Sequence, residues 1–144
     1  MSLAIASHRF PGSGYEQCVA IRMAVFVHEQ KIPLEEELDQ LDGGGTHFLA
    51  LLDGQPAGTA RLLFKENGTV GKITRVAVLA EYRGQGIGAA LFRHIEATAG
   101  VQVFMLNAQE HALPFYAGLG YVAEGDTFME AGIPHRRMKK VAAF

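Results

Sequence analysis

The sequence predicts an α/β fold, in which one mixed sheet carries helices on its faces. Apolar runs in the middle of the chain are separated by Asp53-Gly54 and Asn67-Gly68, dipeptides typical of hairpin turns, which indicates an antiparallel meander. After Leu79 the pattern changes to strand, helix, strand, helix, which indicates a β-α-β-α segment. The 144 residues are 49% hydrophobic and 19% charged, so we expect a single globular domain over residues 1–144.

The first part of the chain predicts one strand and two helices. Residues 3–9 are a short, mostly apolar run and are expected to form the first strand. Apolar residues recur near helical spacing over residues 14–28, which predicts an amphipathic helix. Residues 34–41 are acidic and follow Pro33, a residue suited to a helix start, so a second helix is expected there.

The middle of the chain predicts three strands joined by tight turns. The runs 47–52 and 57–65 flank the Asp53-Gly54 turn, and residues 69–79 are rich in β-branched side chains. Together they predict the antiparallel meander.

The last part of the chain predicts helices and strands in alternation. Ile87, Leu91 and Ile95 fall four apart, which places them on one face of a helix leading through residues 89–99. The remaining expected elements are a buried strand at 101–106, a helix at 110–119 that ends at Gly120, and strands at 121–123 and 136–141.

Composition excludes several classes of function. A formal net charge of −2 argues against a dedicated nucleic-acid binder, because such domains are usually clearly basic. No apolar run approaches the roughly 18 residues of a membrane helix, and no secretory signal is apparent. The lone Cys18 rules out an internal disulfide, and the histidines include no HxxxH pair, so no metal site is expected. We therefore expect a cytoplasmic protein without nucleic-acid or membrane partners.

A glycine-rich loop precedes the helix at 89–99 and is the main functional motif. Its sequence is Arg83-Gly84-Gln85-Gly86-Ile87-Gly88-Ala89. Glycines let a ligand approach the backbone, and free N–H groups at a helix start attract anions, so the loop is a candidate diphosphate cradle to which Arg83 could add a charged donor. A tight turn without a ligand, or a dinucleotide site of an oxidoreductase, are the alternatives, although the latter motif normally follows the first strand of a βαβ unit.

Two further blocks of sequence occur together with this loop. Arg83, Gly86 and Gly88 match the pattern Gln/Arg-x-x-Gly-x-Gly/Ala, and Leu106-Asn107-Ala108-Gln109 and Pro114-Phe115-Tyr116 follow in order. These blocks resemble the acetyl-CoA site of the GNAT superfamily of N-acetyltransferases. The likeness extends to the ElaA-type subgroup through the blocks around Glu29-Gln30, His47, His111 and Gly132-Ile133-Pro134-His135.

The resemblance implies a fold and a donor site. In this family two central strands, here 69–79 and 101–106, splay apart and acyl-CoA lies in the opening. Backbone groups of Val76 and Val78 would then hold the pantetheine arm, and the Val78 N–H would polarise the thioester carbonyl. The implied acetyl-CoA contacts are Val76, Ala77, Val78, Arg83, Gly84, Gln85, Gly86, Ile87, Gly88, Ala89, Asn107 and Tyr116.

The resemblance also implies catalytic residues. Tyr116 matches the family's general acid, which protonates the leaving thiolate; packing beside Phe115 is the structural alternative. The general base stays open: Glu29 and His111 are the expected catalytic candidates, His47 is also considered, and Glu37, Asp39 and Asp42 are weaker alternatives. Glu29, His47 and His135 are the residues expected to contact the acceptor substrate.

The function implied is acetyl transfer from acetyl-CoA to a primary amine by direct attack in a ternary complex. The alternative is an acyl-CoA-binding or sensing module on the same fold that performs no turnover. The acceptor stays open between a small molecule and a protein amine, as does the choice between acetyl and longer acyl donors. A homodimer is a common assembly for soluble proteins and stays an open alternative.

Overall fold

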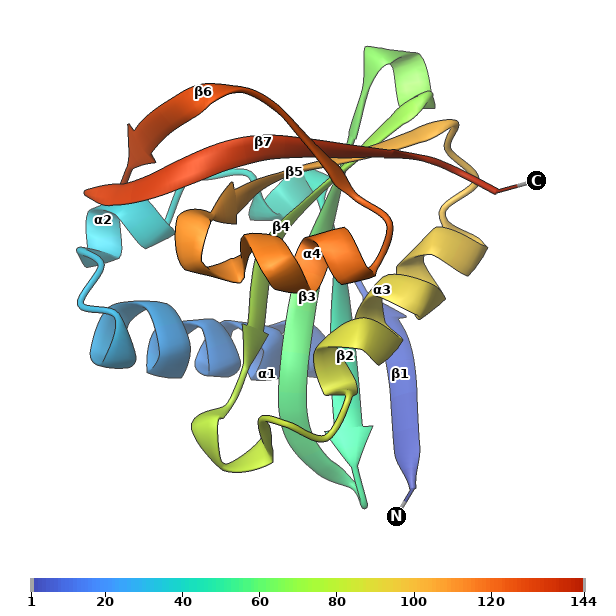
Figure 1. Cartoon of the computed structure of the whole chain (residues 1–144). Helices are drawn as coiled ribbons and strands as arrows, with labels where there is room; N and C mark the ends of the chain where they lie inside the picture. The colour runs from blue at the N-terminus through green and yellow to red at the C-terminus, as the bar shows by residue number, and fades with distance from the viewer. Residues whose placement is uncertain (1, 144) are drawn as a thin grey trace.

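The computed structural model describes residues 2–143, which form one seven-stranded mixed sheet with strand order β1-β2-β3-β4-β5-β7-β6 (Figure 1). The pair β4–β5 is parallel and every other neighbouring pair is antiparallel. The strands are β1 (Leu3–His8), β2 (Thr46–Leu52), β3 (Gln55–Lys65), β4 (Val70–Val78), β5 (Val103–Gln109), β6 (Val122–Glu130) and β7 (Ile133–Val141). The predicted fold class and its central meander are therefore confirmed.

Helices cover both faces of the sheet. Helix α3 (Ile87–Thr98) and helix α4 (Leu113–Gly118) lie in front of the sheet in Figure 1, and helix α1 (Ser13–Arg22) lies behind it. The α1 helix continues as π-helical turns over Met23–Glu29, and a short α2 helix follows at Leu34–Glu37. Within residues 2–143, every helix is too short or too polar to traverse a bilayer.

Several predicted boundaries are wrong for local backbone reasons. The acidic helix stops at Glu37 instead of residue 41, because Leu38 adopts an extended backbone. The strands expected at 121–123 and 136–141 belong to one long hairpin, which turns at Ala131 and Gly132 with φ values of 52° and 73°. Positive φ is rare for alanine, so this turn carries little sequence signal.

The larger core lies between the sheet and the helices α3 and α4. The Phe92 side chain is 1% exposed and its ring packs edge-on against the rings of Phe115, Tyr116 and Tyr121. Helix α3 approaches β3 so closely that a Cβ atom at Gly58 would lie 3.0 Å from the Ile87 side chain. A second, smaller core lies under α1 and the π-helical turns.

A bulge in β4 positions the functional half of that strand. Thr74 pairs with Arg61 of β3, whereas Ala77 pairs with Thr59, so β4 has one residue more than β3 in this interval. Arg75 lies in the bulge with a left-handed φ of 53°, which costs roughly 1–2 kcal/mol for a residue that carries a Cβ. Before the bulge, Ile73 packs into the larger core; after it, Ala77 packs under α1, so the bulge exchanges the faces of the strand.

Ion pairs hold the bulged residue in place. Arg75 Nε lies 2.7 Å from Glu37 Oε2, and the Arg75 guanidinium also donates to the Glu37 carbonyl. The Glu37 carboxylate is 1% exposed and binds Arg22 at 2.9 Å. The same cluster continues through Asp39, Arg61 and Asp42, in which each guanidinium meets two carboxylates. The left-handed Arg75 is thus fixed by a buried carboxylate from α2.

Replacing Glu37 with glutamine should destabilise the fold by about 3 kcal/mol, because Arg22 and Arg75 would both lose a buried counter-charge. Denaturant unfolding of both proteins measures the difference. The matched control is Glu35→Gln, an exposed α2 residue that should change stability by less than about 0.5 kcal/mol. Equal losses in the two variants would contradict the role given to Glu37.

Candidate active site

The central parallel pair separates and leaves an opening in the sheet. Strands β4 and β5 pair only over Val70–Lys72 and Val103–Met105, after which β5 continues beside β7 alone. A cleft of about 700 Å³ occupies the opening and is lined by residues of both strands. The splayed strand pair expected from sequence is therefore present.

The open edge of β4 presents backbone N–H groups to the cleft. Leu79 donates its N–H to Ala57 of β3 at 2.9 Å, so the alternation of the strand turns Val78 and Val76 away from β3, toward the opening. The Val78 carbonyl supports this direction, because it accepts a hydrogen bond at 2.9 Å from Arg83 of the loop after β4 and not from β3. Ala77 faces the other way and packs in the smaller core, a position that does not favour its predicted contact with a cofactor.

The glycine loop lies where the edge of β4 leads into α3. Gly84 and Gly86 have φ values of 79° and 80°, and nothing lies within 4 Å of a Cβ atom built on either. The Ile87 side chain is 2% exposed and anchors the helix start, while Gly88 leaves room for the Phe115 ring. The first N–H groups of α3 therefore point from an open, unobstructed loop, which suits an anion.

Arg83 and Glu29 form a bidentate ion pair at the mouth of the cleft. The two nitrogen–oxygen distances are 2.6 and 2.7 Å, and both side chains are nearly half exposed. The hydrogen bond from Arg83 holds the pKa of Glu29 below its usual value, which weakens Glu29 as a proton acceptor. In this conformation Glu29, the candidate base, and Arg83, the candidate donor at the rim of the loop, are paired with each other, and both roles stay predictions.

The Tyr116 side chain reaches the cleft from the face of the sheet that α3 and α4 cover. Its ring packs against Phe92 at 5.4 Å and Phe115 at 5.1 Å, measured between ring centroids. Within residues 2–143 no hydrogen-bond partner of the Tyr116 hydroxyl is found, and the residue lines the cleft. Burial raises the pKa of Tyr116 to about 12, so the phenol keeps its proton at neutral pH.

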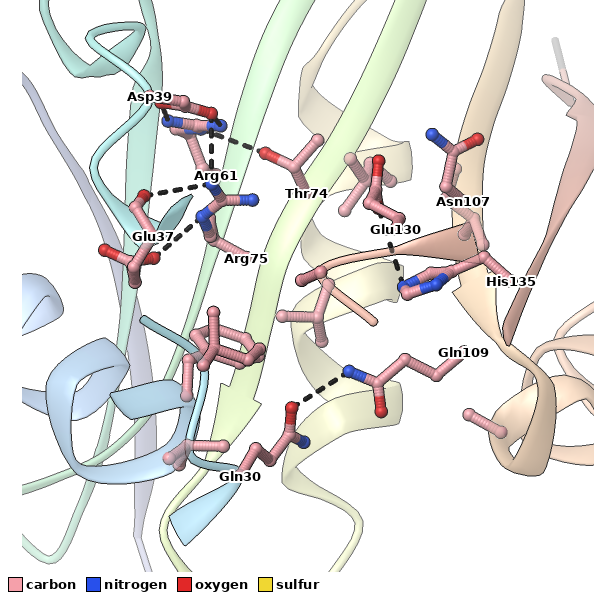
Figure 2. A pocket seen from close by; sticks show the side chains of 18 of the residues that line it. Gln30, Glu37, Asp39, Arg61, Thr74, Arg75, Asn107, Gln109, Glu130 and His135 are labelled. Carbon is pink, nitrogen blue, oxygen red and sulfur yellow. Dashed lines mark hydrogen bonds and ion pairs between the residues drawn. The ribbon is translucent and has the colours of Figure 1, made fainter. Parts of the chain in front are cut away.

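A set of polar side chains lies on the α1 face of the opening, opposite Tyr116. In β5, Leu106 and Ala108 pack in the larger core, so Asn107 and Gln109 face the α1 side. His135 of β7 pairs with Gln109 and shares this face (Figure 2). Gln109 donates to the Gln30 side chain at 3.0 Å, which links β5 to the end of the π-helical turns.

His135 is enclosed and held on two sides. It is 6% exposed, its Nδ1 lies 2.7 Å from the Ile133 carbonyl oxygen, and its Nε2 lies 3.5 Å from a carboxylate oxygen of Glu130. The Phe128 ring stacks on the imidazole at 5.9 Å between centroids. Figure 2 shows His135, Glu130 and Asn107 on the wall opposite Arg75.

The two other histidines expected at the site differ in position. His111 lines the cleft, is exposed, and lies with Nε2 2.7 Å from the Gln109 side-chain oxygen. His47 is 1% exposed, with Nε2 3.0 Å from the Asp42 carbonyl oxygen and its ring against Tyr15. His47 lies outside the cleft lining, and its expected contact with substrate stays a prediction that this position does not favour.

Sequence reasoning gave no role to Gln30 and Glu130. Gln30 was visible only as part of a matching block, and its partner Gln109 lies 79 residues away. Glu130 faces His135 across the β6–β7 hairpin. The turn at Ala131 and Gly132 brings the two residues together, and Gly132 is its one indication in the sequence.

Comparisons with known proteins agree with this geometry. A family model described as the acetyltransferase (GNAT) domain matches residues 12–142. The uncharacterized N-acetyltransferase YjcF of Bacillus subtilis is 39% identical over 124 residues, covering 83% of this chain and 87% of the relative. The crystal structure of an acyl-CoA N-acyltransferase from Pseudomonas aeruginosa is similar with a TM-score of 0.81 and 28% identity, covering 97% and 100% of the two chains. Escherichia coli ElaA is similar with a TM-score of 0.84 and 26% identity, covering 96% and 99%.

The ion-pair cluster that contains Asp39 and Asp42 should make the folded protein less stable in acid. Burial opposes ionisation of Asp39 and Asp42, but hydrogen bonds and charges from their partners outweigh it and hold both pKa values below the usual range. The unfolded chain therefore takes up protons that the folded chain does not, and stability decreases as pH falls below about 4. The urea concentration at the midpoint of unfolding, measured between pH 6 and pH 2.5, reports this loss of stability. The Asp39→Asn variant should be less stable than the wild type at pH 6, and its midpoint should fall less on acidification. A midpoint that rises on acidification would contradict it.

Proposed function

Because the chain belongs to the acetyltransferase (GNAT) family, we propose that it transfers an acetyl group from acetyl-CoA to a primary amine by direct attack in a ternary complex. The observation that carries the proposal is the opening between β4 and β5, with the unpaired edge of β4 on one side and the glycine loop at its end. An extended arm with amide groups and a terminal diphosphate fits such an edge and loop.

The acyl donor would enter along β4 from the glycine loop. Its diphosphate would accept hydrogen bonds from N–H groups between residues 83 and 89, where Gly84 and Gly86 leave the backbone open. An arm running inward from this loop meets Val78 before it meets Val76. The thioester is at the far end of the arm, so Val76, and not Val78, is the better placed donor to its carbonyl oxygen.

The acceptor would approach from the other face of the sheet. Tyr116 and α3 lie on one face, whereas Asn107, Gln109 and His135 lie on the α1 face. The opening connects both faces, so an amine and a thioester can meet inside it without passing one another. Glu36 and Glu130, both acidic residues of the cleft lining, favour a cationic acceptor such as an alkylammonium group of a small molecule or a protein.

The reaction requires a proton for the departing thiolate, and Tyr116 can supply it. A pKa of about 12 lies roughly 3.5 units above that of a free thiol, an unfavourable step of about 5 kcal/mol with a solvated thiolate. A thiolate formed in the same enclosed cleft is also desolvated and more basic, which reduces this difference. Proton transfer that accompanies cleavage of the carbon–sulfur bond avoids the free thiolate.

Binding without turnover is the second candidate function. It is favoured by the Arg83–Glu29 ion pair, which leaves neither group free in this conformation. Calorimetric titration with acetyl-CoA and with NADH, followed by thiol release with glucosamine, spermidine, lysine and a lysine peptide, separates the possibilities. We expect acetyl-CoA to bind and at least one amine to release thiol. Tight binding with no release supports a sensing module, and preference for NADH overturns the proposal.

Replacing Gly86 with valine should weaken acetyl-CoA binding by about tenfold or more, because a branched side chain would fill the open loop. Gly54→Val is the matched control: Gly54 has nearly the same φ, 82°, and equally open surroundings, but lies in the β2–β3 turn. Both variants carry similar backbone strain, so their melting temperatures should fall alike. Calorimetry that gives the two variants the same affinity for acetyl-CoA would refute the cradle.

Replacing Tyr116 with phenylalanine should lower kcat by about 100-fold while leaving acetyl-CoA affinity unchanged, because only the proton donor is removed. Tyr121→Phe is the control, since the Tyr121 hydroxyl donates to Glu96 in the core at 2.8 Å. That variant should lose stability and keep its kcat. A Y116F enzyme as fast as the wild type in steady-state thiol release would exclude Tyr116 as the acid.

A further inference from the structure

We propose that His135 is the general base that deprotonates the acceptor amine, through its Nε2 atom and with Glu130 as the route for the proton to solvent. The proposal rests on the proposed acetyl transfer. It assigns a chemical step to a residue for which the sequence indicated only proximity to substrate.

The hydrogen bond to Ile133 fixes which ring nitrogen can act. Nδ1 lies 2.7 Å from a carbonyl oxygen, which can only accept, so the single hydrogen of the neutral ring lies on Nδ1. The lone pair is then on Nε2. Stacking on Phe128 and an exposure of only 6% keep the ring in this orientation. An imidazole nitrogen with an available lone pair is a group that general-base catalysis uses.

The position of His135 suits the acceptor rather than the donor. It lies on the α1 face beside Gln109 and two residues along β5 from Asn107, which corresponds to roughly 7 Å of strand. Tyr116 lines the same cleft from the opposite face. A base on one face and an acid on the other match a reaction in which the amine and the thioester meet between them.

Other candidate bases are less suited in this structure. The Glu29 carboxylate is occupied by both guanidinium nitrogens of Arg83. His47 lies outside the cleft lining. His111 reaches the cleft, but it is exposed and held only by the Gln109 side chain. Among these side chains, His135 alone combines an enclosed position, a fixed tautomer and a place on the acceptor face.

The surroundings of His135 provide an exit for the proton. Glu130 Oε2 lies 3.5 Å from Nε2, and the Glu130 side chain is 53% exposed, so it contacts both the ring and water. The charged and titratable groups around this part of the cleft lie on several elements. They are Glu130 on β6, Arg136 and Arg137 on β7, Lys72 on β4, Glu36 on α2, His111, the Glu29–Arg83 pair, and the paired Arg61, Arg75, Glu37 and Asp39 of the far wall. Arg61, Arg75, Glu37 and Asp39 on the opposite wall form ion pairs with one another. Glu130 is therefore the carboxylate in contact with the His135 ring.

The proton and electron balance closes with His135, Glu130 and Tyr116. His135 Nε2 takes one proton from the acceptor ammonium, and Glu130 passes it to water. The freed nitrogen lone pair forms the bond to the thioester carbonyl carbon, and the carbon–sulfur bond breaks with its electron pair leaving on sulfur. Tyr116 gives its proton to that sulfur and regains one from the second N–H of the attacking nitrogen. The products are an amide, a thiol and one released proton.

The test compares two nucleophiles that differ in their need for a base. An alkyl amine such as spermidine is protonated at pH 7, whereas hydroxylamine is mostly neutral and needs no deprotonation. The variant is His135→Asn, whose amide nitrogen can still donate to Ile133 but which lacks the Nε2 base. His135→Gln is the second variant should the first fold poorly, and His94→Asn, on α3 outside the cleft lining, controls for loss of a histidine. The alkyl amine used in this comparison is the amine of the panel above that gives the highest kcat/KM for thiol release.

We expect H135N to lose about 100-fold or more in kcat/KM with the alkyl amine at pH 7, with little change for hydroxylamine. The deficit should shrink as pH rises toward the pKa of the amine, and acetyl-CoA affinity by calorimetry should stay within about threefold. A deficit equal for both nucleophiles at every pH, or no deficit, overturns His135 as the base. Wild-type protein that binds no acetyl-CoA, or releases no thiol, instead refutes the acetyl transfer on which the assignment rests.

Discussion

The buried ion pair between Arg75 and Glu37 is the contact on which the site depends. It holds Arg75 in a left-handed conformation that β4 would otherwise avoid, and so maintains the bulge. The bulge exchanges the faces of the strand, and beyond it Val76 and Val78 turn their backbone toward the opening. A carboxylate on the short helix α2 thus determines how the distant edge of β4 is presented.

The same cluster neutralises the charges on one wall of the cleft. Taking charges out of water costs free energy, and each buried guanidinium is paired with two carboxylates. Tyr116 lines the cleft on one face, and His135 with Glu130 lines it on the other. The ion-pair cluster therefore forms a wall of the cleft opposite the side chains proposed to react.

Local signals made part of this structure predictable from sequence. Asp53-Gly54 indicated the hairpin because both residues adopt positive φ, and the spaced glycines indicated the open start of α3. Contacts between distant segments were not predictable: Glu29 and Arg83 are 54 residues apart, and each was interpreted without the other. The pairing of His135 with Glu130 was hidden by a turn containing Ala131, whose positive φ has no sequence signature.

The outer strand β6 has a consequence for self-association. Val122 and Met129 are 69% and 64% exposed on an edge that has no neighbouring strand among residues 2–143, an arrangement that usually invites another chain to extend a sheet. Between Glu124 and Phe128 the strand leaves its register with β7, so the outward row of amide groups is interrupted halfway. An incoming strand would find two short ladders instead of one continuous template, which protects the molecule against edge-to-edge polymerisation.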